Sequence, residues 1–243
     1  SLEPNVISYV AGISACRRGG RWQDAFSLLS ELREAKLEPS IAAYGAIISV
    51  CEKSGRWQSA LSCLLDASES KLELDVITYN SAISACEKGG QWQQALCLLK
   101  ELCTVRLEPS IISYNSAISA CEKGGQWVHA FDLLRELQAC VLTPDAFSLN
   151  SGISSCEQSG QWQQAVSLFN DLLGEPLLKP NVISYNAGIS VCGKSGQTEQ
   201  ALRLIRDSWE ARVDLDIAGF SAGLGACEKF LQWQHVLSLL SEL

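Results

Sequence analysis

Residues 76–102 read VITYNSAISACEKGGQWQQALCLLKEL, and residues 107–110 close the same segment with LEPS. The pattern returns every 35 residues along the chain. A period of this length is typical of a solenoid, in which a core forms only between neighbouring repeats. We therefore expect function to reside on a surface that successive repeats build together. The period is defined by the tyrosines Tyr9, Tyr44, Tyr79 and Tyr114 and the tryptophans Trp22, Trp57, Trp92, Trp127 and Trp162.

Each repeat predicts two helices joined by a tight turn. Tyr79 and Cys86 keep helical spacing, Gly89-Gly90 interrupts it, and the apolar spacing resumes from Trp92. The apolar stripes of each helix pair are expected to be buried against the neighbouring pairs. The residues that end the helices recur as well, at Gly20, Gly55, Gly90, Gly125, Gly160 and Gly196 and at Pro39, Pro109, Pro144 and Pro180.

The 243 residues are predicted to form one repeat array without an internal domain boundary. Residues 1–5 resemble the end of a preceding repeat, so we expect the chain to be a window from a longer array, with no targeting peptide visible. The predicted repeats span residues 6–40, 41–75, 76–110, 111–145, 146–181 and 182–216, followed by a partial repeat over 217–243.

The cysteines and the hydropathy of the chain limit the classes of protein to which it can belong. The 11 cysteines are an odd number, which favours a reducing compartment. Seven of them share one repeat position and lack the paired spacing of zinc ligands, so we interpret them as small buried apolar residues and expect no metal and no cofactor. The chain contains no run of 18 apolar residues, and we expect no membrane insertion. The seven are Cys16, Cys51, Cys86, Cys121, Cys156, Cys192 and Cys227.

The recurring tryptophans have two interpretations. Aromatic rings on nucleic-acid-binding proteins stack on bases. Packing is favoured here, because Trp92 heads the apolar stripe that continues with Ala95 and Leu96 and should fill the space beside the glycine turn. Trp209 lies outside the pattern and has no evident role.

Four recurring stretches together resemble the pentatricopeptide repeat (PPR) pattern: VITYN at residues 76–80, ACEKGGQW at 85–92, AL at 95–96 and LEPS at 107–110. A tetratricopeptide array would have a period of about 34 residues. The resemblance covers essentially the whole chain and is to the 35-residue P type. It implies a right-handed, all-α superhelical solenoid, and a protein that is located in a mitochondrion or plastid. It also implies binding of single-stranded RNA at about one base per repeat, in RNA processing, stability or translation.

In this family the fifth and the last residue of a repeat select the base. An asparagine amide can donate and accept at a base edge, and the last residue supplies the discriminating group. Asp145 and Asp216 suit the ring N–H of uracil, Ser110 can donate to the ring nitrogen of cytosine, and Asn181 suits either pyrimidine. The four central repeats would then read C-U-Y-U from 5′ to 3′, whereas Val10 and Gly45 depart from the pattern. The pairs carried onto this chain are Val10 with Ser40, Gly45 with Asp75, Asn80 with Ser110, Asn115 with Asp145, Asn150 with Asn181, and Asn186 with Asp216.

Helix capping is the alternative explanation for the last residue of each repeat. Ser, Asp and Asn directly before a helix are good N-caps. The asparagines at the fifth position are harder to explain in this way, because asparagine has poor helix propensity and offers no core packing.

Two more periodic sets are candidates for RNA contacts. The first lies three residues before the fifth position and would sandwich bases, or else belong to the core: Ile77, Ile112, Phe147 and Ile183. The second would contact phosphates, or else complement the negative ends of helices: Arg18, Lys53, Lys88, Lys123, Lys194 and Lys229. Gln158 interrupts this second set, and a glutamate precedes most of its members.

The net charge of −8 argues against a strongly basic RNA-binding surface. A protein-interaction scaffold, or an architectural subunit of an organellar ribosome or another large complex, is therefore the alternative function. An enzyme is not expected, and neither is a small-molecule substrate. Residues 219–223 match Gly-x-Ser-x-Gly, but that motif needs a strand before it and a helix after it. His129 and His235 occupy different repeat positions without a paired nucleophile.

Overall fold

The computed structural model describes residues 5–140, 142–174 and 180–229, and the regular secondary structure in these ranges is helical. The prediction of all-α helix pairs is confirmed. The remainder of the predicted partial repeat, 230–243, lies outside the described residues. The first helices of the repeats are α1 (Val6–Gly19), α3 (Ile41–Lys53), α5 (Val76–Lys88), α7 (Ile111–Lys123), α9 (Ala146–Ser155), α11 (Val182–Lys194) and α13 (Ile217–Lys229). The second helices are α2 (Trp22–Glu34), α4 (Trp57–Glu69), α6 (Trp92–Thr104), α8 (Trp127–Ala139), α10 (Trp162–Gly174) and α12 (Thr198–Glu210).

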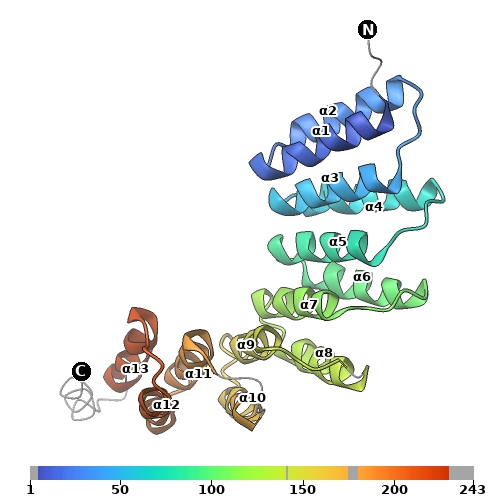
Figure 1. Ribbon diagram of the computed structural model, residues 1–243. Helices are drawn as coiled ribbons and strands as arrows, with labels where there is room; N and C mark the ends of the chain where they lie inside the picture. Colours follow the sequence, from blue (N-terminus) through green and yellow to red (C-terminus); the bar gives the residue numbers. More distant parts are fainter. Residues whose placement is uncertain (1–4, 141, 175–179, 230–243) are drawn as a thin grey trace. The chain divides into compact units, whose positions relative to one another are not determined.

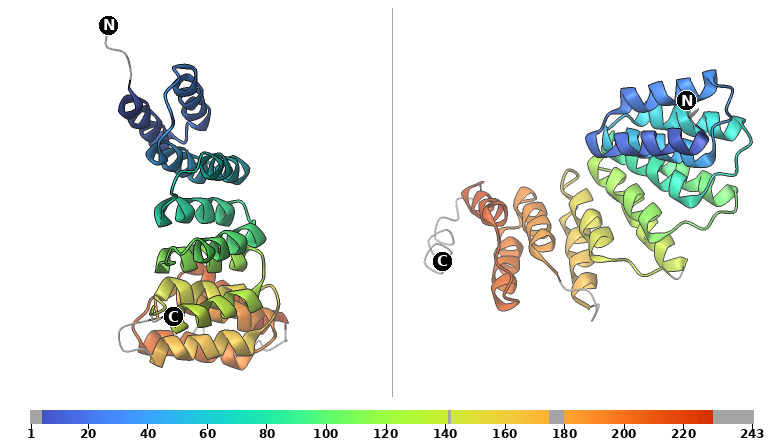
Figure 2. Two further views of the ribbon diagram at one scale, coloured as in Figure 1. Left: turned by 90° about the vertical axis from the view of Figure 1, so that its right-hand side faces the viewer. Right: turned by 45° about the horizontal axis from the view of Figure 1, so that its top comes forward.

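The chain divides into two compact units, residues 1–120 and 121–243. In the first unit α1, α3 and α5 lie side by side, and α2 and α4 each pack on their own first helix and on that of the next repeat (Figures 1 and 2). In the second unit α9, α11 and α13 lie side by side in the same way, with α10 and α12 packed between successive first helices. Each unit is therefore two layers of helices, one of first and one of second helices.

The stacking of successive helix pairs buries the apolar stripe that the sequence repeats. Tyr79, Ile83 and Cys86 on α5 are at most 2% exposed. Burial raises the pKa of the Cys86 thiol to about 11, so the side chain stays neutral and packs as an apolar group. The interpretation of the repeated cysteines as buried apolar residues is confirmed for those described: Cys16, Cys51, Cys86, Cys121, Cys156 and Cys192.

The half-buried tryptophans pack against the turn of the following repeat. Gly89 lies so close to Trp57 that a Cβ at this position would overlap the indole ring. Trp22 holds the same place one repeat earlier, where the guanidinium of Arg56 lies 4.3 Å from the centre of its ring. These contacts support the packing interpretation of the tryptophans and refine it, because the turn that each one covers belongs to the next repeat.

The glycine two residues before each second helix from α2 to α12 adopts a left-handed backbone. Gly90 has a φ of 67°, and the N–H groups of Gly90 and Gln91 return to the carbonyls of Glu87 and Cys86. This is the usual way to end a helix with glycine. The sequence prediction of glycine-terminated first helices is confirmed for most of the array.

Replacing Gly90 by alanine should lower the free energy of unfolding by about 1 kcal/mol, because a Cβ disfavours the left-handed conformation. A Cβ at Gly90 meets no atom within 4 Å. The expected loss of stability would therefore come from the backbone conformation alone and not from a steric clash. Gly174→Ala is the matched control, since a Cβ there also meets nothing within 4 Å and the residue ends α10 in an ordinary conformation. It should leave stability unchanged or raise it. Urea unfolding of both variants tests this, and equal effects would contradict the backbone explanation.

Candidate nucleic-acid interface

The structure brings the fifth and last residues of a repeat together in the repeat that spans 76–110. The amide nitrogen of Asn80 donates a hydrogen bond to Ser110 Oγ at 3.3 Å. Its amide oxygen accepts from Ser113 Oγ at 2.6 Å. Residues 30 positions apart in the sequence therefore present their polar groups at one place, between the starts of α5 and α7.

The fifth and last residues also lie together in the repeat that spans 182–216. Asn186 Nδ2 donates to Asp216 Oδ1 at 2.8 Å. The amide oxygen of Asn186 is buried and has no hydrogen-bond partner among the described residues. It faces the backbone of α13 so closely that a Cβ at Gly219 would overlap it. The pairing of the fifth and last residues thus recurs in both units of the chain.

The other asparagine candidates are arranged less uniformly. Asn150 is only 6% exposed, and its buried amide oxygen has no partner within the described ranges. Asn181, which closes the same repeat, accepts hydrogen bonds from Ser184 instead. Asn115 is half-buried.

The first two repeats lack an asparagine at the fifth position. Val10 is half-buried on α1, and Gly45 on α3 has no side chain to offer. A Cβ at Gly45 would lie 3.4 Å from Thr78 Oγ1, which corresponds in repeat position to the Ser113 hydroxyl that binds Asn80.

The last residues of the repeats also cap the helices that follow them. Asp75 Oδ1 accepts from the Thr78 backbone N–H at 2.8 Å, and Asp145 Oδ1 accepts from Ser148 in the same way at 2.8 Å. The capping interpretation is therefore confirmed. It does not exhaust Asp75, because the second oxygen of that carboxylate forms no hydrogen bond with the described residues. The other caps described are Ser40, Ser110, Asn181 and Asp216.

The apolar residues three positions before the asparagines lie on the surface. Ile77 is 74% exposed and Phe147 53%, so their side chains are not core residues. Ile112 and Ile183 are exposed as well. Ile7 was not among the residues predicted from the sequence, but it has the same repeat position and is also exposed. Its place in the period is the signal that identifies it. The array thus carries a periodic row of exposed apolar side chains beside the asparagines.

Two of the predicted phosphate-contacting lysines form ion pairs with the preceding repeat. Lys88 Nζ lies 2.7 Å from Glu52 Oε1, and Lys194 Nζ lies 2.6 Å from Glu157 Oε1. Both lysines remain exposed at the surface. In the sequence Glu87 stands directly before Lys88, whereas Gly193 stands before Lys194. For both lysines the partner is the glutamate of the preceding repeat.

A serine of the following repeat completes each ion pair. Ser84 Oγ donates to Glu52 at 3.3 Å, and Ser190 Oγ donates to Glu157 at 2.6 Å. Burial alone would raise the pKa of Glu157, but the hydrogen bonds from Lys194 and Ser190 outweigh it and hold the pKa below its ordinary value. The glutamate is therefore ionised at neutral pH and links the two repeats.

The remaining cations of this set differ in their surroundings. Lys53 and Arg18 are exposed, and within the described residues neither forms an ion pair or hydrogen bond. For Lys53 the reason lies in the preceding repeat, where Arg17 stands at the position that holds glutamate in most other repeats. Lys123 is exposed at the end of α7. The side chain of Lys229 lies outside the described part of the chain.

The Gly-x-Ser-x-Gly match does not have the setting that a hydrolase nucleophile needs. Gly219–Gly223 lies inside α13 rather than at a strand-to-helix turn. In the described ranges no group of three or more His, Cys, Asp or Glu side chains could hold a metal ion. His129 lies on α8, and His235 is outside the described residues. None of the helices described is long and apolar enough to span a membrane.

A family model for the pentatricopeptide repeat domain matches residues 1–54 and 62–123. A model for the single PPR repeat matches residues 42–71, 112–140, 147–176 and 183–212. The chain belongs to the pentatricopeptide repeat family. The resemblance inferred from the recurring stretches is thus confirmed. A comparison with curated proteins gave no match.

Solved structures of other PPR proteins share the fold. The pentatricopeptide repeat protein PPR10 from maize is 25% identical, with a TM-score of 0.76 over 99% of this chain and 35% of that chain. PPR10 in complex with an 18-nt psaJ RNA element is 20% identical, with a TM-score of 0.58 over 95% of this chain and 38% of that chain. The PPR domain of Arabidopsis thaliana protein-only RNase P 1, in complex with tRNA, is 13% identical, with a TM-score of 0.63 over 77% of this chain and 94% of that chain. The present PPR chain therefore spans about a third of the length of PPR10.

The link between Glu157 and the next PPR repeat should make stability depend on pH. Because the folded state lowers the pKa of Glu157, its contribution is present above the pKa of unfolded glutamate, about 4.3, and is lost as the pH falls through the lower folded-state value. Glu157→Gln should therefore lower the free energy of unfolding at pH 7 by at most about 1 kcal/mol, since Lys194 is exposed.

The difference in the free energy of unfolding between Glu157→Gln and the unaltered chain should shrink from pH 6 to pH 3. Urea unfolding at several pH values measures this difference. Glu38→Gln is the control, because Glu38 is exposed and makes no ion pair or hydrogen bond with the described residues. A difference that stays constant with pH would contradict the role given to the Glu157 carboxylate.

Proposed function

We propose that this PPR chain binds single-stranded RNA along the starts of its first helices, at about one base per repeat and without catalysis. The observation that carries the proposal is the meeting of Asn80 with Ser110 and of Asn186 with Asp216. In each pair two polar side chains lie within hydrogen-bond distance, so the edge of a single base can contact both of them.

The two pairs differ in the group that they offer to a base. At the Asn186 pair, Asp216 Oδ1 accepts from Asn186 and from the N–H groups of Ala218 and Gly219. Oδ2 forms no hydrogen bond with the described residues and can accept the ring N–H of uracil. At the Asn80 pair, the Ser110 hydroxyl can donate to the ring nitrogen of cytosine. The proposed preference over the four central repeats is C-U-Y-U.

The exposed apolar side chains of this row are placed to pack against the faces of RNA bases. Ile77 and Ile183 lie three residues before Asn80 and Asn186, and therefore on the same faces of α5 and α11. Bases held between such residues of successive repeats would bury apolar surface that is now exposed to water. The PPR10 complex with psaJ RNA and the PPR domain complex with tRNA are RNA complexes of the same fold, which supports RNA as the ligand class here.

The net charge of −8 and the ion pairs at Lys88 and Lys194 imply a modest phosphate contribution. Lysines engaged with glutamates must share or leave these partners before they bind phosphate, so base contacts would carry much of the affinity. We propose RNA processing, stabilisation or translation in a mitochondrion or plastid as the setting, on family resemblance alone. One structural neighbour is a nuclear protein-only RNase P from Arabidopsis thaliana, so this fold also occurs in a nuclear enzyme.

A protein scaffold is the second candidate. The exposed Ile77 and Ile183 side chains, together with Val10 and Gly45 at the fifth position, would also suit an apolar protein partner. If a labelled 5′-C-U-Y-U-3′ RNA and its purine-substituted control both fail to bind at moderate salt, the scaffold becomes the better explanation.

Exchanging the last residues of two repeats should exchange their base preferences. The double variant Ser110→Asp with Asp216→Ser should prefer 5′-U-U-Y-C-3′ over 5′-C-U-Y-U-3′, with about 1–3 kcal/mol of discrimination for each changed base. Because Ser and Asp cap helices about equally well, stability should stay nearly unchanged. Fluorescence anisotropy with both RNAs gives the preference, and an unaltered order of affinities would contradict the base-reading assignment.

Neutralising Lys88 should weaken binding to every RNA alike. Lys88→Gln should make the dependence of log K on log salt shallower by about 0.7. Glu52→Gln should have the opposite effect on affinity, because it releases Lys88 from its ion pair. Lys100→Gln, on the exposed surface of α6, is the control and should leave the salt dependence unchanged. Titrations at several salt concentrations measure these slopes, and a Lys88 effect confined to one RNA sequence would argue against a phosphate contact.

A further inference from the structure

The fourth residue of most repeats is a tyrosine whose ring fills the space between two successive second helices. The Tyr44 hydroxyl accepts a hydrogen bond at 3.0 Å from Arg33, which lies 11 residues before it. The Tyr79 hydroxyl donates at 3.0 Å to Glu101, which lies 22 residues after it. The hydroxyl of Tyr44 thus bonds to the second helix of the preceding repeat, and that of Tyr79 bonds to the second helix of its own repeat.

The last described repeats have the same arrangement. The rings of Tyr185 and Phe169 lie 5.0 Å apart between centres, and the Tyr185 hydroxyl donates to the carbonyl of Asp207, again 22 residues later. Phe220 replaces the tyrosine in the next repeat, and its ring lies 6.4 Å from that of Trp209, 11 residues before it. This contact accounts for Trp209, for which the sequence offered no role.

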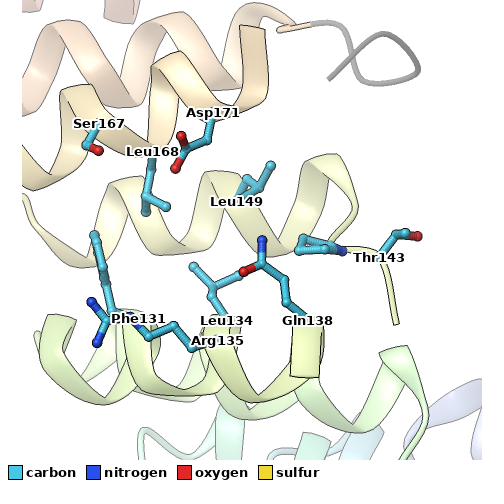
Figure 3. A pocket seen from close by; sticks show the side chains of 10 residues that line it. Phe131, Leu134, Arg135, Gln138, Thr143, Leu149, Ser167, Leu168 and Asp171 are labelled. Carbon is cyan, nitrogen blue, oxygen red and sulfur yellow. The ribbon is translucent and has the colours of Figure 1, made fainter. Parts of the chain in front are cut away.

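The repeat that spans 146–181 has Leu149 at this position, and a cavity of about 350 Å³ opens beside it between α8 and α10. The volume lies at the lower end of the range for small-molecule sites, about 300–1,000 Å³. Figure 3 shows Leu134 and Gln138 on one side of the cavity, Leu149 in the middle, and Leu168 and Asp171 on the other side.

The walls keep the groups that surround a tyrosine in the other repeats. Gln138 lies 11 residues before Leu149, as Arg33 does before Tyr44, and Asp171 lies 22 residues after it, as Glu101 does after Tyr79. Leu134 has the repeat position of Phe169. This repeat therefore keeps the apolar walls, one hydrogen-bond donor and one hydrogen-bond acceptor of the tyrosine site, but it has no tyrosine ring.

We propose that this cavity binds a substituted phenol, with the aromatic ring between Leu134 and Leu168 and the hydroxyl between Gln138 and Asp171. Leu134, Leu149 and Leu168 are only 5–8% exposed, so the ring would gain van der Waals contacts with their side chains rather than cover much apolar surface that water now reaches. The Asp171 carboxylate would accept from the phenol, and the Gln138 amide would donate to it. Asp171 and Gln138 are exposed and have no hydrogen-bond partner among the described residues, so a phenol would compete only with water for them. The site needs no RNA and is independent of the base-reading pairs.

Isothermal titration of the intact chain with p-cresol and with toluene tests the proposal. We expect p-cresol to bind at least ten-fold more tightly than toluene, and Asp171→Ala to remove most of this difference. Equal binding of the two compounds, or no binding of p-cresol to the folded chain, would overturn the proposal. N-acetyl-tyrosine amide, titrated in parallel, identifies the source of the phenol: tighter binding than p-cresol indicates a peptide tyrosine, and weaker binding indicates a free small molecule.

Filling the cavity from within provides the second measurement. Leu149→Tyr should abolish p-cresol binding and raise the melting temperature above that of Leu149→Phe, which supplies the ring without the hydroxyl. Should Leu149→Tyr fail to fold, Leu134→Phe fills the same space from α8 with the side chain of Phe169 and should also abolish binding. Binding of p-cresol that persists in a folded, filled variant would place the phenol elsewhere and overturn the proposal.

Discussion

A helix pair of this chain has no core of its own, because its apolar stripes are buried only where the next pair stacks on it. Tyr79, Ile83 and Cys86 on α5 are buried in this way, and the same residue types return in the neighbours. Since each neighbour offers the same stripe, the stacking has one favoured register. That register brings residues about one repeat apart into contact, as with Asn80 and Ser110 or Lys88 and Glu52. The candidate RNA contacts and the links between repeats both depend on it.

The residue that closes each repeat serves the fold and the proposed function together. Asp216 caps α13 through Oδ1, which also accepts from Asn186. These bonds hold the carboxylate in one orientation, so little side-chain entropy remains to be lost when a base binds. Capping and base reading are therefore compatible demands on one side chain, although from the sequence they were alternatives. The same holds for Lys88, which links two repeats and still lies at the surface.

Departures from the repeat change single sites without changing the scaffold. Arg17 stands where most other repeats have glutamate, and Lys53 accordingly has no ion pair among the described residues. Leu149 stands where other repeats have tyrosine, and a cavity lies beside it. Gly45 removes a side chain from the fifth position while α3 keeps its length. Because each repeat contacts only its neighbours, such changes remain local, and an array of near-identical units can carry different sites.

The sequence by itself determined the helix pairs, their order, the buried cysteines and the glycine turns, because these follow from local periodicity and from backbone conformations that favour glycine. It also indicated the family and the pairs of positions proposed to read bases. Only the tertiary structure decided which partner each polar group has. The glutamate of Lys88 is Glu52 rather than the adjacent Glu87, and Ile77 is exposed rather than in the core. The physical reason is that ion pairs, exposure and cavities arise between repeats, and a pattern read along one repeat does not specify which faces meet.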